Sequence, residues 1–383
     1  MLPCPLSAAR DLAPTLAERA AGIEEARRLP ADLAATMAGA GLFRLAIPQS
    51  LDGHELHPAR MAEVLEAVAQ GDASAAWCLM IGATTALVAA YLPRPHAEEV
   101  LGERDVVTGG VFAPMGKAIA ENGHYRVSGR WSWASGSANC RWLVGGAIIL
   151  DGGEMRKRPD GQPDHRMMIM PRAEVELIDT WHAAGLKGTG SGDMAVREVI
   201  VPADRSVSLI TDTPREEGAL YRFPAFGLLA LGIAAVASGN ARAALDAAAE
   251  ALTGRKTPGS GRTQAERATA QATLAEAEGR LFAARAGLMA AIDAAWQEAE
   301  TGRISALGRA RLRLQATFLT RTAADVTRAA YDLGGGGALY LASPLQRRFR
   351  DAHAMTQHIM VQPATYELAG RVRLGLPTDT STL

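Results

Sequence analysis

The feature that most constrains the fold is a double change in the spacing of apolar residues along the chain. From Ala8 to about Gly102 they recur every three or four positions, which is typical of helices. Between about Val106 and Asp204 they alternate, as in HYRVSGRWSW, and turn signals such as ENG and DGG separate the runs, which indicates antiparallel strands. From about Phe223 the helical spacing returns over long segments, which predicts a bundle of antiparallel helices. The order predicts an α+β, mostly α, fold with three domains: helices at 1–105, an antiparallel sheet or barrel at 106–215, and a helical bundle at 216–383.

Composition indicates which partners the chain can have. The 40 basic and 41 acidic side chains nearly cancel, so no overall field would draw the chain to nucleic acid or to an anionic membrane. Cys4, Cys78 and Cys140 form no CxxC and no paired framework, which fits a reducing compartment. The N-terminus has no basic start followed by an apolar run, so no secretory signal is expected. We therefore expect a cytoplasmic protein whose partner is a small molecule.

One segment needs a test against a membrane span. Residues 75–92 carry no charge and are long enough to cross a bilayer. However, a helix-capping GDAS precedes the run, Pro93 and Pro95 end it, and Gly82 with two threonines lowers its hydrophobicity. We interpret this segment as a buried core helix.

The histidines do not have the spacing of a metal site. His54 and His57 lie in HELHP, which is not HExxH and in which a proline follows directly. His353 and His358, in RDAHAMTQH, would lie about 140° apart around a helix and would not face one ion. We therefore predict no metal.

The four glycines of DLGGGGAL make no nucleotide-binding motif either. They form neither a GxGxxG that opens a helix nor a P-loop, and the chain has no GxSxG for a nucleophilic serine. Two interpretations of the run remain open: a helix end and turn, or a close approach of backbone to a ligand.

Two clusters in the sheet region combine aromatic and small polar residues. In GRWSWASG, alternation places Trp131 and Trp133 on one strand face with Ser132 opposite, and these tryptophans could be core or could contact a ligand. The loop LKGTGSGD adds Thr189 and Ser191 among glycines whose amides are expected to be free. Aromatic planes beside amides and hydroxyls suit a planar heteroaromatic ligand.

The segment RRFRDAHAMTQH mixes charges with a histidine in an apolar setting. Arg347, Arg348, Arg350 and Asp351 are interpreted as a solvated or salt-bridged surface, with Asp351 on the same helix face as His358. Apolar residues follow His358, which indicates a partly buried imidazole. That imidazole could transfer a proton or could be a satisfied core residue.

Taken in order, the motifs GRWSWASG, DTWHAAGLKGTGSGD, GRKT and YDLGGGG…RRFRDA resemble the acyl-CoA dehydrogenase superfamily over essentially the whole chain. Within it they look like the reduced-flavin monooxygenases of two-component systems, such as the oxygenase of 4-hydroxyphenylacetate hydroxylase and dibenzothiophene monooxygenase. The resemblance implies an N-terminal helical domain, a middle antiparallel β-barrel and a C-terminal four-helix bundle. It also implies a homotetramer that takes reduced FMN or FAD from a separate reductase and, with dioxygen, hydroxylates a small organic substrate, expected to be aromatic.

The resemblance also assigns residues around the flavin. It places Trp133 and Ser135 along the flavin ring, and Phe112 and Ala113 at its border. Thr189 and Ser191 would lie near the flavin face of the barrel. Arg255 would meet the flavin phosphate from a neighbouring subunit. The backbone of Gly335, Gly336 and Gly337 would approach the flavin across a subunit contact. Trp77 and Thr85 would line the substrate pocket.

The catalytic position departs from the dehydrogenase pattern. Dehydrogenases of this family commonly have a glutamate base nine residues after the arginine of RDA, and here that position is Ile359, which cannot accept a proton. His358 instead matches the histidine of the monooxygenases, where an imidazole near its normal pKa would give a proton to the oxygen leaving a flavin C4a-hydroperoxide. No histidine lies between His57 and His96, so phenol activation by a histidine there is not implied. The alternatives are a dehydrogenase or flavin oxidase with its base elsewhere, and a non-catalytic flavin-fold protein.

Overall fold

The N-terminal part of the computed structural model, which describes residues 3–254 and 261–383, is helical. Proline at the first turn starts α1 and α3, because a missing N–H costs nothing there. The Asp72 carboxylate caps α4 by accepting the Ala75 N–H at 2.8 Å. The helices of this part are α1 (Pro5–Ala26), α2 (Ala31–Gly39), α3 (Pro58–Gly71), α4 (Ala73–Thr85) and α5 (Arg94–Leu101).

The segment that could have crossed a membrane lies inside the protein. Helix α4 and the 3-10 turn that continues it, Ala86–Ala90, are buried at every position. A second helix, α7 (Ala225–Gly254), is also long and apolar enough to span a bilayer, and most of it is buried as well. The interpretation of residues 75–92 as a core helix is confirmed.

The middle part is an eight-stranded sheet in the order β6-β7-β2-β1-β3-β5-β8, with β4 paired to β3. The pairs are antiparallel except β1 with β3, which run parallel, so the expectation of a purely antiparallel sheet is wrong at that pair. Between Val111 and Gly116 the register of β1 on β3 shifts, which marks a bulge. The strands are β1 (Thr108–Glu121), β2 (His124–Trp131), β3 (Trp142–Asp151), β4 (Glu154–Met155), β5 (His165–Pro171), β6 (Glu176–Ile178), β7 (Asp193–Pro202) and β8 (Ser206–Val207).

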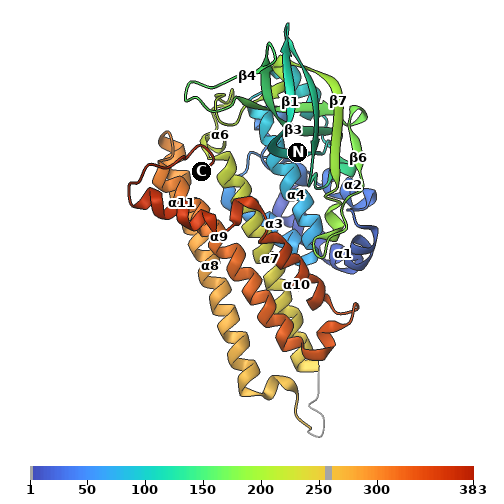
Figure 1. Cartoon of the computed structure of the whole chain (residues 1–383). Coiled ribbons are helices and arrows are strands. Elements are labelled where there is room, and N and C mark those ends of the chain that lie inside the picture. The colour runs from blue at the N-terminus through green and yellow to red at the C-terminus, as the bar shows by residue number, and fades with distance from the viewer. Residues whose placement is uncertain (1–2, 255–260) are drawn as a thin grey trace.

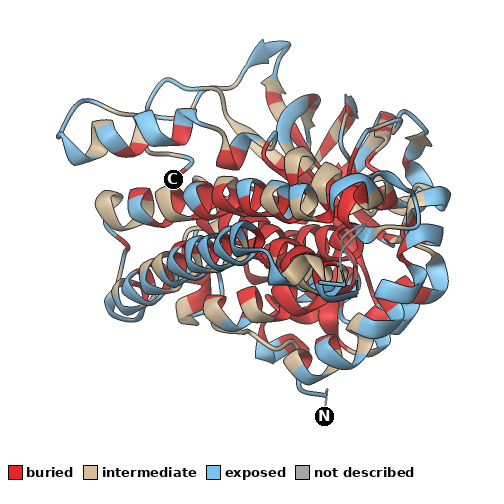
Figure 2. Ribbon diagram, turned by 90° about the horizontal axis from the view of Figure 1, so that it is seen from below, coloured by how far each residue is buried: buried red, intermediate tan, exposed pale blue. Residues whose placement is uncertain are grey.

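The C-terminal part is built on long helices beneath the sheet (Figure 1). Leu281, Leu288 and Ile292 of α8 are buried, and separations of seven and four residues place them on one face of the helix. Figure 2 shows the buried residues gathered where the long helices meet, with exposed residues on the outer faces. The predicted domain limits at 105 and 215 stay a prediction. The helices are α6 (Ala219–Arg222), α7 (Ala225–Gly254), α8 (Ala268–Thr301), α9 (Ala306–Gly334), α10 (Pro344–Met355) and α11 (Ala364–Arg373).

Candidate flavin and substrate site

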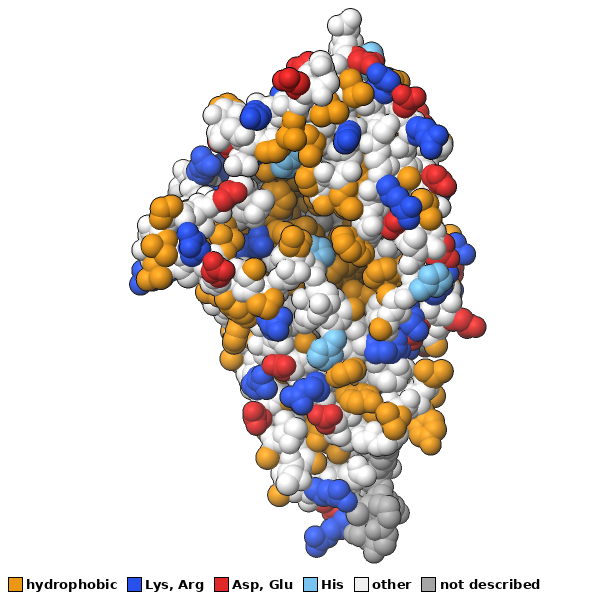
Figure 3. Space-filling view, viewed as in Figure 1, with side chains coloured by type: hydrophobic (Ala, Val, Ile, Leu, Met, Phe, Trp, Pro, Cys, Tyr) orange, Lys and Arg blue, Asp and Glu red, His pale blue; other side chains and the backbone are white. Residues whose placement is uncertain are grey.

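The face seen in Figure 3 is hollowed between the sheet above and the helices beneath it, and hydrophobic side chains line the hollow. Three of the predicted segments are brought together around the side chain of Trp77 on α4. They are the end of β2 with Ser135, the loop with Thr189 and Ser191, and the turn with His358.

The two tryptophans of GRWSWASG have different environments. Trp131 is fully buried, its Nε1–H donates to the Gly146 carbonyl at 2.7 Å, and glycines leave room for its ring. Trp133 is 64% exposed. The prediction that both share one strand face is wrong, because β2 ends at Trp131 and Trp133 has a left-handed backbone, with φ +67°. Trp131 is a core residue, and Trp133 exposes its ring just beyond the end of β2, at one end of the sheet.

The bulge of β1 lies at the same end of the sheet. The antiparallel pairing of β1 with β2 ends at Gly116↔Gly129. The residues before Gly116 and those after Gly129 are therefore no longer paired with each other. Ala113 is exposed, and Phe112 is half-buried against the Phe226 ring, at 6.5 Å between centroids. The exposed indole of Trp133 and the exposed stretch of bulged strand offer aromatic and apolar groups of the kind that suit the ring system of a flavin.

Behind this end of the sheet, buried hydroxyl groups form a hydrogen-bonded chain. The Trp77 Nε1–H donates to Ser135 Oγ at 3.1 Å, and Ser135 Oγ lies 2.6 Å from Ser191 Oγ. Ser191 Oγ lies 2.6 Å from Thr189 Oγ1, which donates to the Leu186 carbonyl at 2.8 Å. These predicted flavin residues therefore lie together, with their side chains bonded to one another.

The loop amides are less free than the sequence suggested. The N–H groups of Thr189, Gly190 and Gly192 donate to carbonyls within the same turn, at 2.8 to 3.3 Å. The expectation of free amides is wrong at these three positions, because the tight turns use them.

A buried carboxylate on α10 holds this loop from behind. Asp351 Oδ1 accepts the Leu186 N–H at 2.6 Å, and Leu186 has a left-handed backbone, with φ +51°. Burial, and secondly the charge of Asp72, raises the pKa of Asp351 to about 7. Its neighbour Arg348 is buried too and donates to the carbonyls of Gln70 and Gly71. The prediction of a solvated surface is wrong for Arg348 and Asp351, which join α10 to other elements.

His358 lies in a turn and not on a helix. Helix α10 ends at Met355, so the expectation that Asp351 and His358 share a helix face is wrong. His358 caps the next short turn, where its Nδ1 accepts the Met360 N–H at 3.2 Å, and its ring packs edge-on against Trp77 at 5.7 Å. Ile359 beside it is 73% exposed.

The ionisation of His358 also differs from the prediction. Burial, and secondly the charge of Arg313, lowers its pKa to about 4, so an imidazole near its normal pKa is the wrong expectation. Since Nδ1 accepts a backbone hydrogen bond, the neutral ring carries its proton on Nε2. At pH 7 His358 is thus a neutral hydrogen-bond donor.

Arg313 is a residue of this site that the sequence did not reveal. It is 4% exposed on α9, and its guanidinium donates to the Met360 carbonyl at 3.1 Å and to the Thr382 carbonyl at 2.6 Å. It therefore joins the His358 turn to the C-terminal residues. The one sequence signal for the burial of Arg313 is its position next to Leu312, on the apolar face of a predicted helix.

The other predicted residues form no hydrogen bond with this cluster within the described residues, or cannot be placed. Thr85 is 1% exposed, and its hydroxyl has no hydrogen-bond partner within the described residues. Gly335 ends α9 with φ +53°, which fits the helix-end interpretation, while Gly336 is exposed and Gly337 half-buried. Arg255 lies outside the described residues. Within residues 3–254 and 261–383, no three metal-ligand side chains gather.

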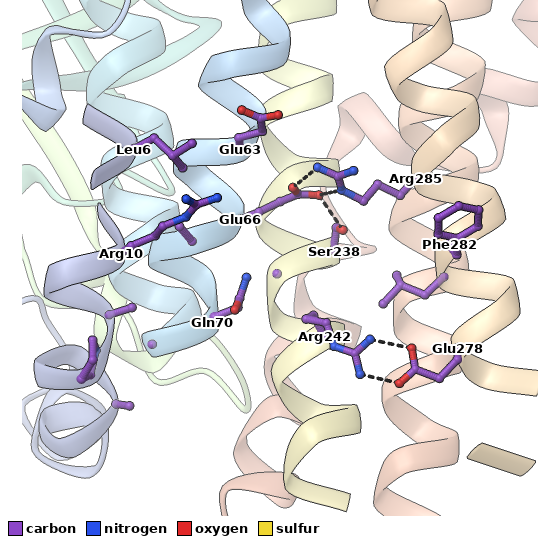
Figure 4. Close-up of a pocket in the computed structure, with 17 residues that line it drawn as sticks. Leu6, Arg10, Glu63, Glu66, Gln70, Ser238, Arg242, Glu278, Phe282 and Arg285 are labelled. Carbon is purple, nitrogen blue, oxygen red and sulfur yellow. Dashed lines mark hydrogen bonds and ion pairs between the residues drawn. The ribbon is translucent and has the colours of Figure 1, made fainter. Parts of the chain in front are cut away.

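A second hollow, a groove of about 670 Å³ between α1, α3, α7 and α8, contains charged pairs (Figure 4). Glu66 binds Arg285 through two hydrogen bonds of 2.7 and 2.8 Å, and Arg242 binds Glu278 through two of 2.5 Å. None of the predicted site residues that the structure describes lines this groove.

Comparisons with known proteins agree with this architecture. The family description "Acyl-CoA dehydrogenase, N-terminal domain" matches residues 6–99, and "Acyl-CoA dehydrogenase, C-terminal domain" matches residues 231–363. The chain is 31% identical to an indole-3-acetate monooxygenase of Pseudomonas putida, over 91% of this chain and 88% of that protein. It is 30% identical to the flavin-dependent monooxygenase oxygenase subunit HsaA of Rhodococcus jostii, over 96% and 98% of the two chains.

A solved structure shares the whole fold. XiaF from Streptomyces sp., in complex with FADH2 and glycerol, superimposes with a TM-score of 0.89 at 25% identity, over 97% of this chain and 95% of that one. The chain belongs to the acyl-CoA dehydrogenase family, in its branch of flavin-dependent monooxygenases.

Proposed function

We propose that this flavin-dependent monooxygenase is the oxygenase component of a two-component system, with His358 as the residue that handles the reacting oxygen. It uses reduced FMN or FAD and dioxygen to hydroxylate a small aromatic substrate. A separate reductase supplies the reduced flavin, as the names of relatives called oxygenase subunits imply. We further propose that it works as a cytoplasmic homotetramer.

The observation that carries the role of His358 is a neutral imidazole next to Ile359, the position at which dehydrogenases of this family commonly have their base. The Met360 N–H fixes one ring nitrogen and Trp77 packs on the ring, so the Nε2–H has a defined direction. Ile359 next to it cannot remove a proton from a substrate. A neutral His358 beside Ile359 favours a reaction with dioxygen over removal of an α-proton from a substrate.

The residues at this end of the sheet fit the flavin, and when bound it supplies the reduced ring that activates dioxygen. We propose that the Trp133 indole and the Phe112–Ala113 stretch hold that ring. The hydroxyl chain of Ser135, Ser191 and Thr189 would stiffen the wall behind it. The apolar lining of the hollow would exclude water, which limits the loss of activated oxygen as peroxide.

With a pKa of about 4, only about one His358 ring in a thousand carries a second proton at pH 7. We therefore propose that His358 acts through its Nε2–H, which donates a hydrogen bond to the oxygen as charge develops on it. This refines the idea of a protonated imidazole.

The substrate pocket is proposed next to Trp77. The Thr85 hydroxyl, buried without a partner among the described residues, would be available to a polar group of the substrate. Relatives that act on aromatic compounds, among them indole-3-acetate monooxygenase and a resorcinol hydroxylase, support an aromatic substrate.

The proposed tetramer is supported by the surface next to the glycines. Leu339, Tyr340 and Leu341 are 68%, 72% and 82% exposed in a single chain, and such a run fits a subunit contact. A contact there would bring Gly335–Gly337 to a neighbouring subunit's flavin.

The test compares His358→Ala with His358→Gln, whose side-chain amide keeps a donor near the Nε2 position. We expect His358→Ala to release most reducing equivalents as hydrogen peroxide and His358→Gln to keep more product. Peroxide and product are measured per reduced flavin consumed, and anaerobic titration checks that flavin binding is unchanged. His353→Gln, on α10 of the same segment, is the matched control. Unchanged coupling in His358→Ala would remove His358 from the mechanism, and reduction of a tightly bound flavin by an acyl-CoA would favour a dehydrogenase.

A further inference from the structure

A pocket of about 510 Å³ lies beside the proposed active site, under the last residues of the chain. Its aromatic wall includes the Phe226 ring, which packs against Phe112 at the flavin edge. Leu209, Ile210 and Phe226 line both this pocket and a small hollow beside Phe112. The pocket is therefore one aromatic ring away from the proposed flavin surface. Its other aromatic residues are Tyr91, Tyr221 and Phe223.

Three guanidinium groups line this pocket, and none makes an ion pair within the described residues. Arg222 donates to the carbonyls of Ala299 and Glu217, which are neutral acceptors. Arg309 donates to the Thr380 carbonyl at 3.0 Å, and its Nε is buried with no partner in the part of the chain described.

The charge of Arg303 is also uncompensated, since this exposed arginine forms no ion pair within the described residues. Burial, and secondly Arg303, lowers the pKa of Arg309, whereas a nearby carboxylate would raise it. Asp379 is the acidic side chain among the described lining residues, and it accepts the Ser381 N–H at 2.9 Å.

The groove of Figure 4 makes a useful contrast. There Arg242 and Arg285 each face a carboxylate through two hydrogen bonds, so the protein itself neutralises them. In the pocket under the C-terminus, Arg222, Arg303 and Arg309 form no ion pair within the described residues, and the Asp379 carboxylate there accepts the Ser381 N–H instead. Aromatic walls next to unpaired guanidinium groups are suited to an aromatic anion.

We propose that this pocket binds the carboxylate of an aromatic acid substrate, with Arg303 and Arg309 as its partners and the aromatic ring directed past Phe226 towards Phe112. The inference deepens the proposed function and rests on it, because it names the class of compound that the monooxygenase hydroxylates. It also makes Arg303 and Arg309, which precede His358 by 55 and 49 residues, determinants of substrate specificity.

The test measures binding without flavin chemistry. Isothermal titration of the full-length protein with indole-3-acetate and with its neutral amide, indole-3-acetamide, at pH 7.5 and low salt compares the same ring with and without the charge. We expect the acid to bind about tenfold tighter or more, as a charge-assisted contact would give. Arg303→Glu should abolish that preference and leave amide binding unchanged.

Two further variants keep the result interpretable. Arg309→Gln should also weaken acid binding about tenfold, but this variant loses the hydrogen bond to the Thr380 carbonyl. Arg303→Glu is therefore the variant that breaks no hydrogen bond of the described fold. Arg311→Gln, exposed on the same helix and outside the pocket, is the matched control and should keep the preference.

The inference is overturned if acid and amide bind equally well to the unmodified protein. It is also overturned if the preference survives in both Arg303→Glu and Arg309→Gln, or disappears in Arg311→Gln. Failure of the proposed function would show separately, as absence of reduced-flavin binding or of hydroxylated product, and neither quantity enters this binding ratio.

Discussion

The buried carboxyl group of Asp351, which holds the loop at Leu186, gives the sharpest quantitative prediction. Asp351 has a pKa near 7 in the folded protein and an ordinary value of about 3.9 when exposed, so the folded state favours its protonated form. A raised pKa contributes stability that is complete below the unfolded value and is lost as pH rises through the folded value. Between pH 5 and pH 8 this removes about 2 to 3 kcal/mol from the free energy of unfolding.

Asp351→Asn should remove that loss. Asparagine Oδ1 can still accept the Leu186 N–H, but it cannot ionise. The variant should therefore gain stability over the unmodified protein as pH rises from 5 to 8, by about 2 to 3 kcal/mol. Asp351→Ala, which leaves the Leu186 N–H buried and unpaired, should instead lose about 1 to 3 kcal/mol.

The assay is urea unfolding at several pH values between 5 and 8, followed by circular dichroism. Asp105→Asn, an exposed aspartate, is the control and should show no pH-dependent gain. A stability difference between Asp351→Asn and the unmodified protein that stays constant across this pH range would refute the reasoning. The reasoning would also be refuted if Asp351→Asn were less stable than the unmodified protein at pH 8.

Two other predictions concern buried side chains of the site. Arg313→Gln removes the cation beside His358, so the pKa of His358 should rise above 4 while burial keeps it below its ordinary value, which NMR titration of the imidazole would show; an unchanged pKa would contradict this. Trp131→Phe leaves the Gly146 carbonyl without its indole donor and opens space in the sheet, which should cost about 2 kcal/mol and lower the thermal midpoint by a few degrees. A midpoint equal to that of the unmodified protein would show that the indole N–H adds nothing.

Periodicity predicted the order of helices and strands well, because burial of one face imposes the period directly. The capping residues and the prolines that follow, and not periodicity, identified α4 as a core helix; periodicity predicted the long helices of the C-terminal part. It failed at Trp133, where strand alternation no longer applies after the chain leaves β2 with a left-handed residue. It also failed at Asp351, because a polar residue on a helix is normally solvated unless a distant backbone group needs it, as Leu186 does here.

The state of His358 is a property of the fold and could not be predicted from the segment that contains it. Its tautomer depends on where α10 ends, since only a residue in the following turn can accept the Met360 N–H. Its low pKa depends on burial, in which the ring of Trp77 packs against it, and secondly on the charge of Arg313; these residues lie 281 and 45 positions away in the chain. The motif match located the histidine, but the match implied an imidazole that gains and loses a proton near pH 7. The structure points to a fixed, neutral donor, and this distinction decides the outcome expected for His358→Gln, because a side chain that cannot be protonated can still replace a hydrogen bond.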